Sequence, residues 1–144
     1  AKGEAKVKSE FEAILEEFYP RYIKVLTEPE FKQFIREIRV EGHTSSEWNT
    51  TRLLDESTTY LKNLELSQLR SFEVLKFILL IPEDPKSKQW FQDKAAAMGY
   101  SSSKLILKTT TLKEDKDRSR RVSFRALLDY EKFMVGFNVE SETN

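Results

Sequence analysis

The sequence has no cysteine and a single histidine, and both shortages exclude classes of chemistry. Without cysteine the chain can form no disulfide, no thiol nucleophile and no cysteine-ligated zinc or iron–sulfur centre. A histidine metal site or a catalytic triad would have to rest on His43, which lies in the polar connector 42–47 and is expected on the surface. We therefore predict no catalytic residue, no metal and no cofactor, and a protein that is not an enzyme.

Glycine and long apolar runs are also scarce. The four glycines stand far apart, so no glycine-rich phosphate loop exists. The longest apolar run, 77–81, has about a quarter of the roughly 20 residues that a membrane-spanning helix needs. The start of the chain lacks the apolar stretch of a secretory signal. These absences predict an intracellular protein with no membrane contact and no evident small-molecule substrate, with cytoplasm, nucleus and mitochondrion left open.

The remaining composition is that of a folded chain. It has 144 residues, 39% of them hydrophobic, and 24 basic residues balance 24 acidic ones. A chain of this length can bury a full core without disulfides. No linker divides it, so we expect one helical domain over 1–144, with a flexible N-terminus at 1–8 and a flexible tail at 136–144.

Apolar residues recur at spacings of three and four over most of the chain, which is the pattern of buried helix faces. The first such segment is 11–26, where Pro20 should end or kink the helix near Tyr19. Thr27-Glu28-Pro29-Glu30 has the composition of a helix start. We expect it to open a helix with Phe31, Phe34, Ile35 and Ile38 on one face, closed by Gly42.

Further helices are expected along the rest of the chain. Segments 48–64 and 66–81 have mostly helical spacing, and Asp84-Pro85 is a cap followed by a first-turn proline. Segment 104–112 has strand propensity but helical surroundings, and helix is favoured over strand. The last helix is expected over about 119–135. The fold class predicted is all-α, a compact bundle of six or seven helices.

One segment resembles a known repeat. It runs Phe91-Gln92-Asp93-Lys94-Ala95-Ala96-Ala97-Met98-Gly99-Tyr100, with Ser103 and Leu107 beyond it. This arrangement resembles the second half of a Sel1-like repeat, a relative of the tetratricopeptide class. The resemblance implies an antiparallel helix pair over about residues 84–112, in which the alanines allow close packing and the glycine permits the reversal.

Charge is unevenly distributed although the total is zero. The segment 104–125 has eight basic and three acidic side chains, a net charge of plus five. A basic segment can hold nucleic-acid phosphates or dock on an acidic protein face, or it can simply be a solvated loop. The candidate binding residues are Lys104, Lys108, Lys113, Lys116, Arg118, Arg120, Arg121 and Arg125.

Arg120-Arg121-Val122-Ser123 resembles the recognition site of basophilic protein kinases. The resemblance makes Ser123 a candidate phosphorylation site, where two added negative charges would lie beside two arginines.

The function predicted from these observations is that of a non-enzymatic interaction or scaffold domain within a larger complex. Seventeen aromatic residues exceed the needs of a small bundle, and exposed aromatics are typical of partner surfaces. The alternative is RNA or DNA binding through 104–125.

Overall fold

The computed structural model describes residues 7–48 and 54–135, which form helices and a small sheet. In chain order the elements are α1 (Ser9–Leu26), α2 (Pro29–Lys32), β1 (Ile35–Gly42), α3 (Glu56–Ile78), α4 (Pro85–Lys94), β2 (Ala95–Gly99), α5 (Lys116–Ser119) and β3 (Val122–Leu128). Residues 130–135 are also helical.

The sheet has the strand order β2-β1-β3, with β1 in the centre. β1 pairs with β2 in parallel, in a register that places Gly42 opposite Gly99. It pairs with β3 antiparallel, with Val40 opposite Phe124 and Glu41 opposite Ser123. The parallel pair requires a crossover, which α3 and α4 provide.

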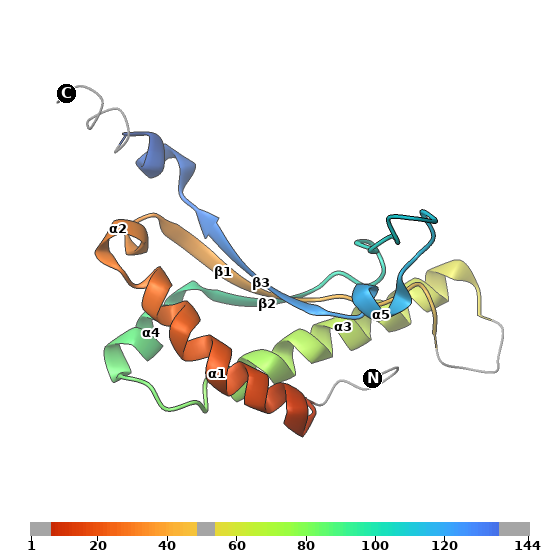
Figure 1. Ribbon diagram of the computed structural model, residues 1–144, viewed down its shortest axis with the longest axis horizontal. Helices are drawn as coiled ribbons and strands as arrows, with labels where there is room; N and C mark the ends of the chain where they lie inside the picture. Colours follow the sequence, from red (N-terminus) through yellow and green to blue (C-terminus); the bar gives the residue numbers. More distant parts are fainter. Residues whose placement is uncertain (1–6, 49–53, 136–144) are drawn as a thin grey trace.

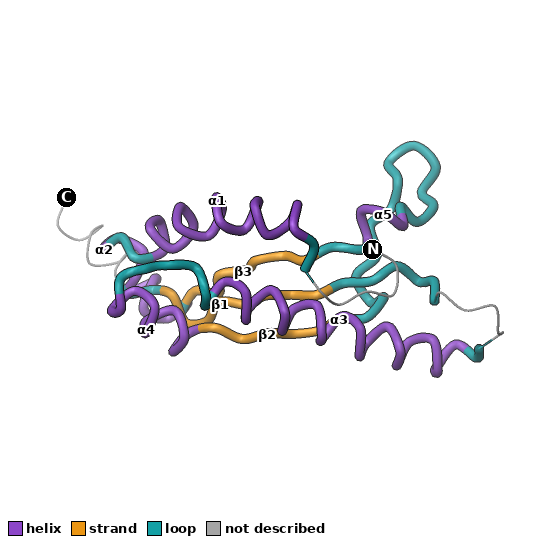
Figure 2. The backbone as a smooth tube through the Cα atoms, turned by 90° about the horizontal axis from the view of Figure 1, so that it is seen from below, coloured by secondary structure: helices purple, strands orange, loops and turns teal. Residues whose placement is uncertain are grey.

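Helices α1, α3 and α4 lie together on one side of the sheet, as Figures 1 and 2 show. Alternate residues of β1, among them Ile38 and Val40, point toward these helices and are fully buried. α1 contributes Tyr19 to the same core, and its Phe18 packs on Phe124 of β3 with ring centroids 5.1 Å apart. These aromatic contacts join α1 to the sheet.

The all-α prediction is wrong at two segments that form strands. In β1 the residues Glu37 to Glu41 alternate between charged and branched apolar side chains, a period of two that fits a half-buried strand. The same segment also fits helical spacing, at Phe31, Phe34, Ile35 and Ile38, and the helix prediction followed that pattern instead. In β3, Val122, Phe124 and Ala126 face the core at the same period, within the segment expected to be the last helix.

The Sel1-like resemblance is also wrong. α4 ends at Lys94, and the alanines that were expected to lie on a helix form β2. Residues 101–104 are a turn, and 104–112 is neither helix nor strand. Its one ladder contact is the isolated antiparallel bridge between Leu107 and Glu114.

Two helix predictions are corrected in their bounds. α1 continues through Pro20, which is exposed, while Tyr19 and Ile23 on its inner face are buried. The two helices expected at 48–64 and 66–81 are replaced by one 23-residue helix, α3. Its first turn is capped by Asp55, which accepts from the Thr58 N–H at 2.8 Å.

The predicted flexible ends lie mostly outside the described residues, namely 1–6 and all of 136–144. The described part of the N-terminal segment is ordered, because Val7 packs against the core and Lys8 is the cap residue of α1. That the chain forms one domain stays a prediction.

The paired glycines of β1 and β2 allow α3 to lie directly on the sheet. A Cβ atom added at Gly42 would come within 2.0 Å of the Ser67 carbonyl oxygen. One added at Gly99 would come within 2.5 Å of the Gln68 backbone nitrogen. Only hydrogen fits between strand and helix at this point, so these glycines determine where α3 crosses the sheet.

Candidate functional site

Polar side chains are buried on both faces of the sheet where β1 ends and α3 crosses it. Most of the described core is apolar, but this end of the sheet buries Glu41, His43, Thr44, Ser45, Asn63, Ser67, Arg70, Ser71 and Ser101. We call these nine residues the polar cluster. Burying polar groups costs free energy unless they are hydrogen-bonded, so such a concentration requires a network or a function.

Ser101 holds the cluster together from the turn that follows β2. Its N–H donates to Ser67 Oγ at 3.0 Å, its hydroxyl donates to the Tyr60 carbonyl at 2.7 Å, and its carbonyl accepts from the Thr44 N–H at 2.9 Å. Its φ of 53° lies in the left-handed region, which is uncommon for serine. Three hydrogen bonds therefore fix a strained turn against α3 and the end of β1.

His43 is buried, so its predicted surface position is wrong. Its side chain stacks on Tyr100, with ring centroids 5.2 Å apart and planes 8° from parallel. Burial and the positive charge of Arg121 lower the pKa of His43 to about 4, while the Glu41 carboxylate opposes this shift. The His43 Nε2 atom is 3.8 Å from Glu41 Oε1, too far for a hydrogen bond. A neutral imidazole packed in this way is not suited to general-base chemistry at pH 7.

The sheet face opposite the helices carries alternating charges. Glu41 is buried there and accepts from Arg125 Nε at 3.2 Å. Arg39, opposite Arg125 in the ladder, donates instead to Glu37 at 2.5 Å. Arg39 and Arg125 thus each have a carboxylate partner on this face of the sheet.

A cleft of about 780 Å³ opens beside the polar cluster, at the start of α3. Ser46 and Ser102 belong to it and directly follow the cluster residues Ser45 and Ser101. Its lining is rich in hydroxyl groups, with one carboxylate and two leucines: Ser46, Leu54, Glu56, Ser57, Thr59, Tyr60, Leu61 and Ser102. This volume and mixture of groups suit a polar ligand with some apolar surface.

Neither the polar cluster nor the cleft was predicted from the sequence. Asn63, Ser67, Arg70 and Ser71 recur at helical spacing on the buried face of α3, and a polar stripe among apolar positions is a signal that the sequence does contain. The contributions of Ser45 and Ser101 depend on the tertiary fold, because they are distant from α3 along the chain.

The structure does not bring the eight predicted basic residues together as one free surface. Four of them are tied to the body of the domain. Lys116 pairs with Glu47, and Arg125 pairs with Glu41. Arg120 contacts Asp117 and donates to Ser45 Oγ at 3.2 Å, while Arg121 donates to the Lys104 carbonyl at 3.1 Å. The other four, all with exposed side chains, are Lys104, Lys108, Lys113 and Arg118.

Ser123 is the second residue of β3, half-buried and opposite Glu41 in the ladder. A phosphate at this position would lie beside a buried carboxylate and within a paired strand. Phosphorylation of Ser123 stays a prediction.

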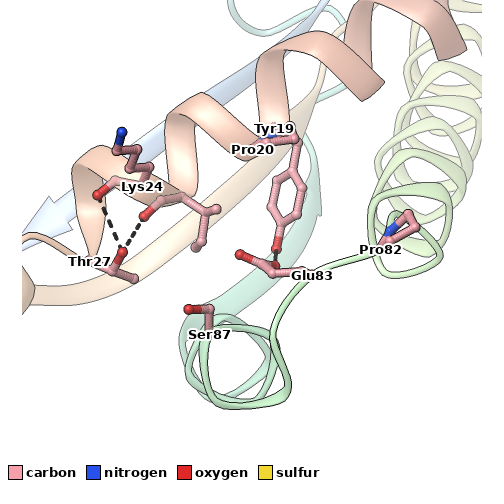
Figure 3. Close-up of a pocket in the computed structure, with 8 residues that line it drawn as sticks. Tyr19, Pro20, Lys24, Thr27, Pro82, Glu83 and Ser87 are labelled. Atoms are coloured by element: carbon pink, nitrogen blue, oxygen red, sulfur yellow. Dashed lines mark hydrogen bonds between the residues drawn. The ribbon is translucent and has the colours of Figure 1, made fainter.

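A smaller pocket of about 230 Å³ lies between α1 and α4 (Figure 3). The Tyr19 hydroxyl donates to Glu83 Oε2 at 2.7 Å across it, and the Thr27 hydroxyl donates to the Ile23 carbonyl at 2.7 Å. These groups satisfy one another, and the pocket has a structural role in joining α1 to the segment before α4.

Metal-binding clusters and membrane-spanning helices complete the description of the site. No group of three or more potential metal ligands occurs within residues 7–48 and 54–135. Over the same ranges, no helix is both long and apolar enough to cross a membrane.

Comparisons with known proteins place the fold. No protein-family model matches the chain. It is 42% identical over 129 residues to the Zorya protein ZorB of Escherichia coli, a match that covers 90% of this chain and 53% of ZorB. The chain therefore spans about half the length of this curated relative.

Solved structures share the architecture at low sequence identity. The periplasmic domain of Helicobacter pylori MotB has a TM-score of 0.55 at 18% identity, and the match covers 99% of this chain and 78% of that one. The peptidoglycan-associated lipoprotein of Burkholderia pseudomallei has a TM-score of 0.54 at 18% identity, with 88% and 86% covered. The chain has the fold of these envelope domains. Helices on one side of a small mixed sheet are thus a known arrangement and not a helical repeat.

Two expectations are corrected by these comparisons. The predicted intracellular location is wrong, since the structures that share the fold are a periplasmic domain and a peptidoglycan-associated protein. RNA or DNA binding has no support, because neither the relative nor these structures are described as nucleic-acid-binding. None is described as an enzyme, which is compatible with a role within a larger complex.

Proposed function

We propose that this chain is an envelope domain that binds peptidoglycan and anchors a larger protein assembly to it. The fold shared with a periplasmic domain and with a peptidoglycan-associated lipoprotein supports this proposal. The 42% identity to ZorB supports a place within a longer protein, since the match covers only 53% of that relative. Protein partners and any attachment to a membrane would then involve the rest of the assembly.

The observation that carries the proposal is the cleft beside the polar cluster. Peptidoglycan presents sugar hydroxyls, peptide amides, carboxylates and small apolar side chains. The hydroxyls of Ser57, Thr59, Tyr60 and Ser102 can pair with the polar groups, whereas the Ser46 hydroxyl already donates to Glu114. Leu54 and Leu61 provide apolar contact. Such a cleft recognises a neutral or mixed-charge polymer without needing the basic segment.

The cluster gives this cleft a rigid wall. Ser101 is hydrogen-bonded on three sides, and its neighbour Ser102 lines the cleft. On the other side the Ser46 N–H donates to Glu114 Oε1 at 2.9 Å. A site whose backbone is held on both sides loses little conformational entropy on binding.

The role proposed is non-catalytic. His43, the chain's single histidine, is neutral and buried, and its ring nitrogens have no hydrogen-bond partner within the described part of the chain. The lining residues of the cleft are hydroxyls, two leucines and one carboxylate, Glu56, with no histidine, cysteine or lysine among them. Binding is therefore the chemistry that this lining supports best.

Co-sedimentation with purified peptidoglycan tests the proposal. Ser57→Trp would fill the cleft from the first turn of α3, and we expect at least a tenfold loss of binding. The matched control is Ser9→Trp, which places the same side chain in the exposed first turn of α1. A second comparison uses two charge-reversal variants, Glu56→Lys in the cleft and Glu10→Lys on α1. It separates loss of the cleft carboxylate from a general effect of net charge.

The outcomes are distinct. Loss of binding in Ser57→Trp alone, with an unchanged melting temperature in both variants, supports the cleft. Equal binding by the two tryptophan variants would place the peptidoglycan site elsewhere. An unmodified protein that does not sediment with peptidoglycan would refute the proposed function.

A further inference from the structure

A basic, leucine-bearing hairpin projects from the same end of the domain as α5, as Figures 1 and 2 show. It spans residues 104–113, and we call it the 104–113 hairpin. Its backbone is closed by a bond from the Lys108 N–H to the Lys113 carbonyl at 2.8 Å and one from the Leu112 N–H to the Lys108 carbonyl at 2.9 Å. Its base is held by the Ile106 N–H, which donates to Ser119 Oγ at 2.9 Å.

The composition of the hairpin separates it from the rest of the molecule. Its sequence, Lys-Leu-Ile-Leu-Lys-Thr-Thr-Thr-Leu-Lys, has three lysines and no acidic residue. The acidic residues that follow lie outside the hairpin: Glu114 contacts Ser46, Asp115 caps α5, and Asp117 pairs with Arg120 while its side chain stays 93% exposed. None of these contacts involves a hairpin lysine, so the three lysine side chains, all exposed, carry positive charge on the hairpin itself.

Leucines are exposed between these lysines. Leu105, Leu107 and Leu112 have side chains that are 37%, 49% and 74% exposed. Leu112 also has a φ of 55°, in the left-handed region where a branched, bulky side chain is a genuine outlier. Leu112 therefore has two features that cost free energy: a strained backbone conformation and an apolar side chain exposed to water. Strain of this kind clusters where it serves a function.

We propose that the 104–113 hairpin inserts its leucines into the surface of an anionic phospholipid membrane. A lipid interface satisfies both features at once, because leucines enter the acyl boundary and lysines remain among the negative headgroups. A polysaccharide offers no apolar phase for the leucines, and an acidic protein face leaves them only a small contact. This inference is independent of the cleft and of peptidoglycan binding.

Flotation with phosphatidylcholine vesicles, with and without phosphatidylglycerol, tests the proposal. We expect the full chain to bind only the anionic vesicles. Each lysine near such a surface contributes about fivefold in affinity, so Lys104→Gln, Lys108→Gln and Lys113→Gln together should weaken binding about a hundredfold. The same three changes at the exposed Lys24, Lys86 and Lys132 are the control and should have little effect.

The leucines have a closely matched control. Leu112 and Leu80 are both 74% exposed, but Leu80 follows α3 and lies outside the hairpin. Leu112→Asp should reduce vesicle binding at least tenfold and Leu80→Asp should not. In parallel, the fluorescence of Leu112→Trp should shift to shorter wavelength with anionic vesicles, whereas that of Leu80→Trp should not.

Three results would overturn the proposal. The first is a failure of the unmodified chain to bind anionic vesicles. The second is equal binding by the two leucine-to-aspartate variants. The third is binding that soluble polyglutamate competes away while Leu112→Asp leaves it intact, which would assign the lysines to an acidic protein partner. Unchanged thermal melting of each variant establishes that the domain remains folded.

Discussion

Replacing Gly42 with alanine tests the central packing feature of this fold. The added Cβ would lie 2.0 Å from the Ser67 carbonyl oxygen and 2.9 Å from the Ser67 carbonyl carbon. Ordinary contact begins at 3.4 Å, so β1 and α3 would have to separate by about 1.4 Å. Both contacts are backbone atoms, and no side-chain rotation can relieve them.

The magnitude follows from the cost of overpacking. Extra methyl groups in a packed core cost about 1–3 kcal/mol, and a clash with backbone belongs at the upper end, about 3 kcal/mol or more. For a chain of this size that corresponds to a fall in melting temperature of about 6–12 °C. Thermal melting followed by circular dichroism, with urea unfolding as a second measure, gives the change directly.

Gly99→Ala provides an internal comparison. Its Cβ would meet the Gln68 side chain at 2.4 Å and the Gln68 nitrogen at 2.5 Å, so part of the clash can be relieved by a side chain. We expect a smaller loss than at Gly42. The double variant should lose less than the sum of the two, because one displacement of α3 relieves both clashes. Ala97→Ser, at an exposed position of β2, is the control. A melting temperature for Gly42→Ala within about 2 °C of the unmodified protein would refute the close approach of β1 and α3.

Two further predictions concern ionisable side chains. The pKa of His43 is about 4 in the folded protein and near 6.5 when unfolded, so the unfolded state takes up a proton first as pH falls. Stability should therefore be highest above pH 6.5 and fall by about 3 kcal/mol toward pH 4. In His43→Phe the decline between pH 6.5 and 5 should disappear in urea unfolding, since the chain has no other histidine; an unchanged decline would contradict the assignment. Tyr19→Phe removes the donor to Glu83 and should cost about 1.5 kcal/mol, whereas Tyr22→Phe, a half-buried residue on the same helix, should be neutral. Equal melting of the two phenylalanine variants would show that the Tyr19 hydrogen bond contributes nothing.

Helical periodicity in the sequence was sufficient to predict a helix where that helix buries a single face. α1 and the start of α4 follow from apolar spacing and from Asp84 before Pro85, whose cap bonds to the Lys86 and Ser87 N–H groups form at 3.0 and 3.3 Å. The break predicted at Pro20 did not occur, because packing of Tyr19 and Ile23 on either side outweighs one missing hydrogen bond.

The three strands differ in how well the sequence predicts them. β1 and β3 contain period-two alternation, which indicates a strand, but the same residues also fit helical spacing, and a helix was predicted. β2 contains no such signal, since three alanines and a methionine favour helix by intrinsic propensity. Its pairing with β1 and the close approach of α3 select small residues there, and these are tertiary effects that no local pattern encodes.

The site was harder to predict than the fold for the same reason. Residues 43–46, 54–61 and 101–102 meet only after β1 and β2 have paired in parallel, and each segment alone has the composition of a polar connector or a helix start. The basic segment 104–125, by contrast, is the most conspicuous charge feature of the sequence. Half of its eight basic side chains nevertheless form contacts within the domain.

The two glycines and the cleft are parts of one arrangement. Because Gly42 and Gly99 let α3 lie on the sheet, Ser67 comes close enough to bind the Ser101 N–H, and the Ser101 hydroxyl reaches the Tyr60 carbonyl. Those bonds place Ser102 and Tyr60 on the walls of the cleft. A displacement of α3 by about 1.4 Å would exceed what two hydrogen bonds near 3 Å can tolerate. Gly42→Ala, if it folds, should therefore weaken the proposed binding of peptidoglycan as well as stability, although no glycine is among the lining residues of the cleft. If Gly42→Ala lowers the melting temperature but leaves binding at full strength, the geometry of the cleft does not depend on the close packing of α3 on the sheet.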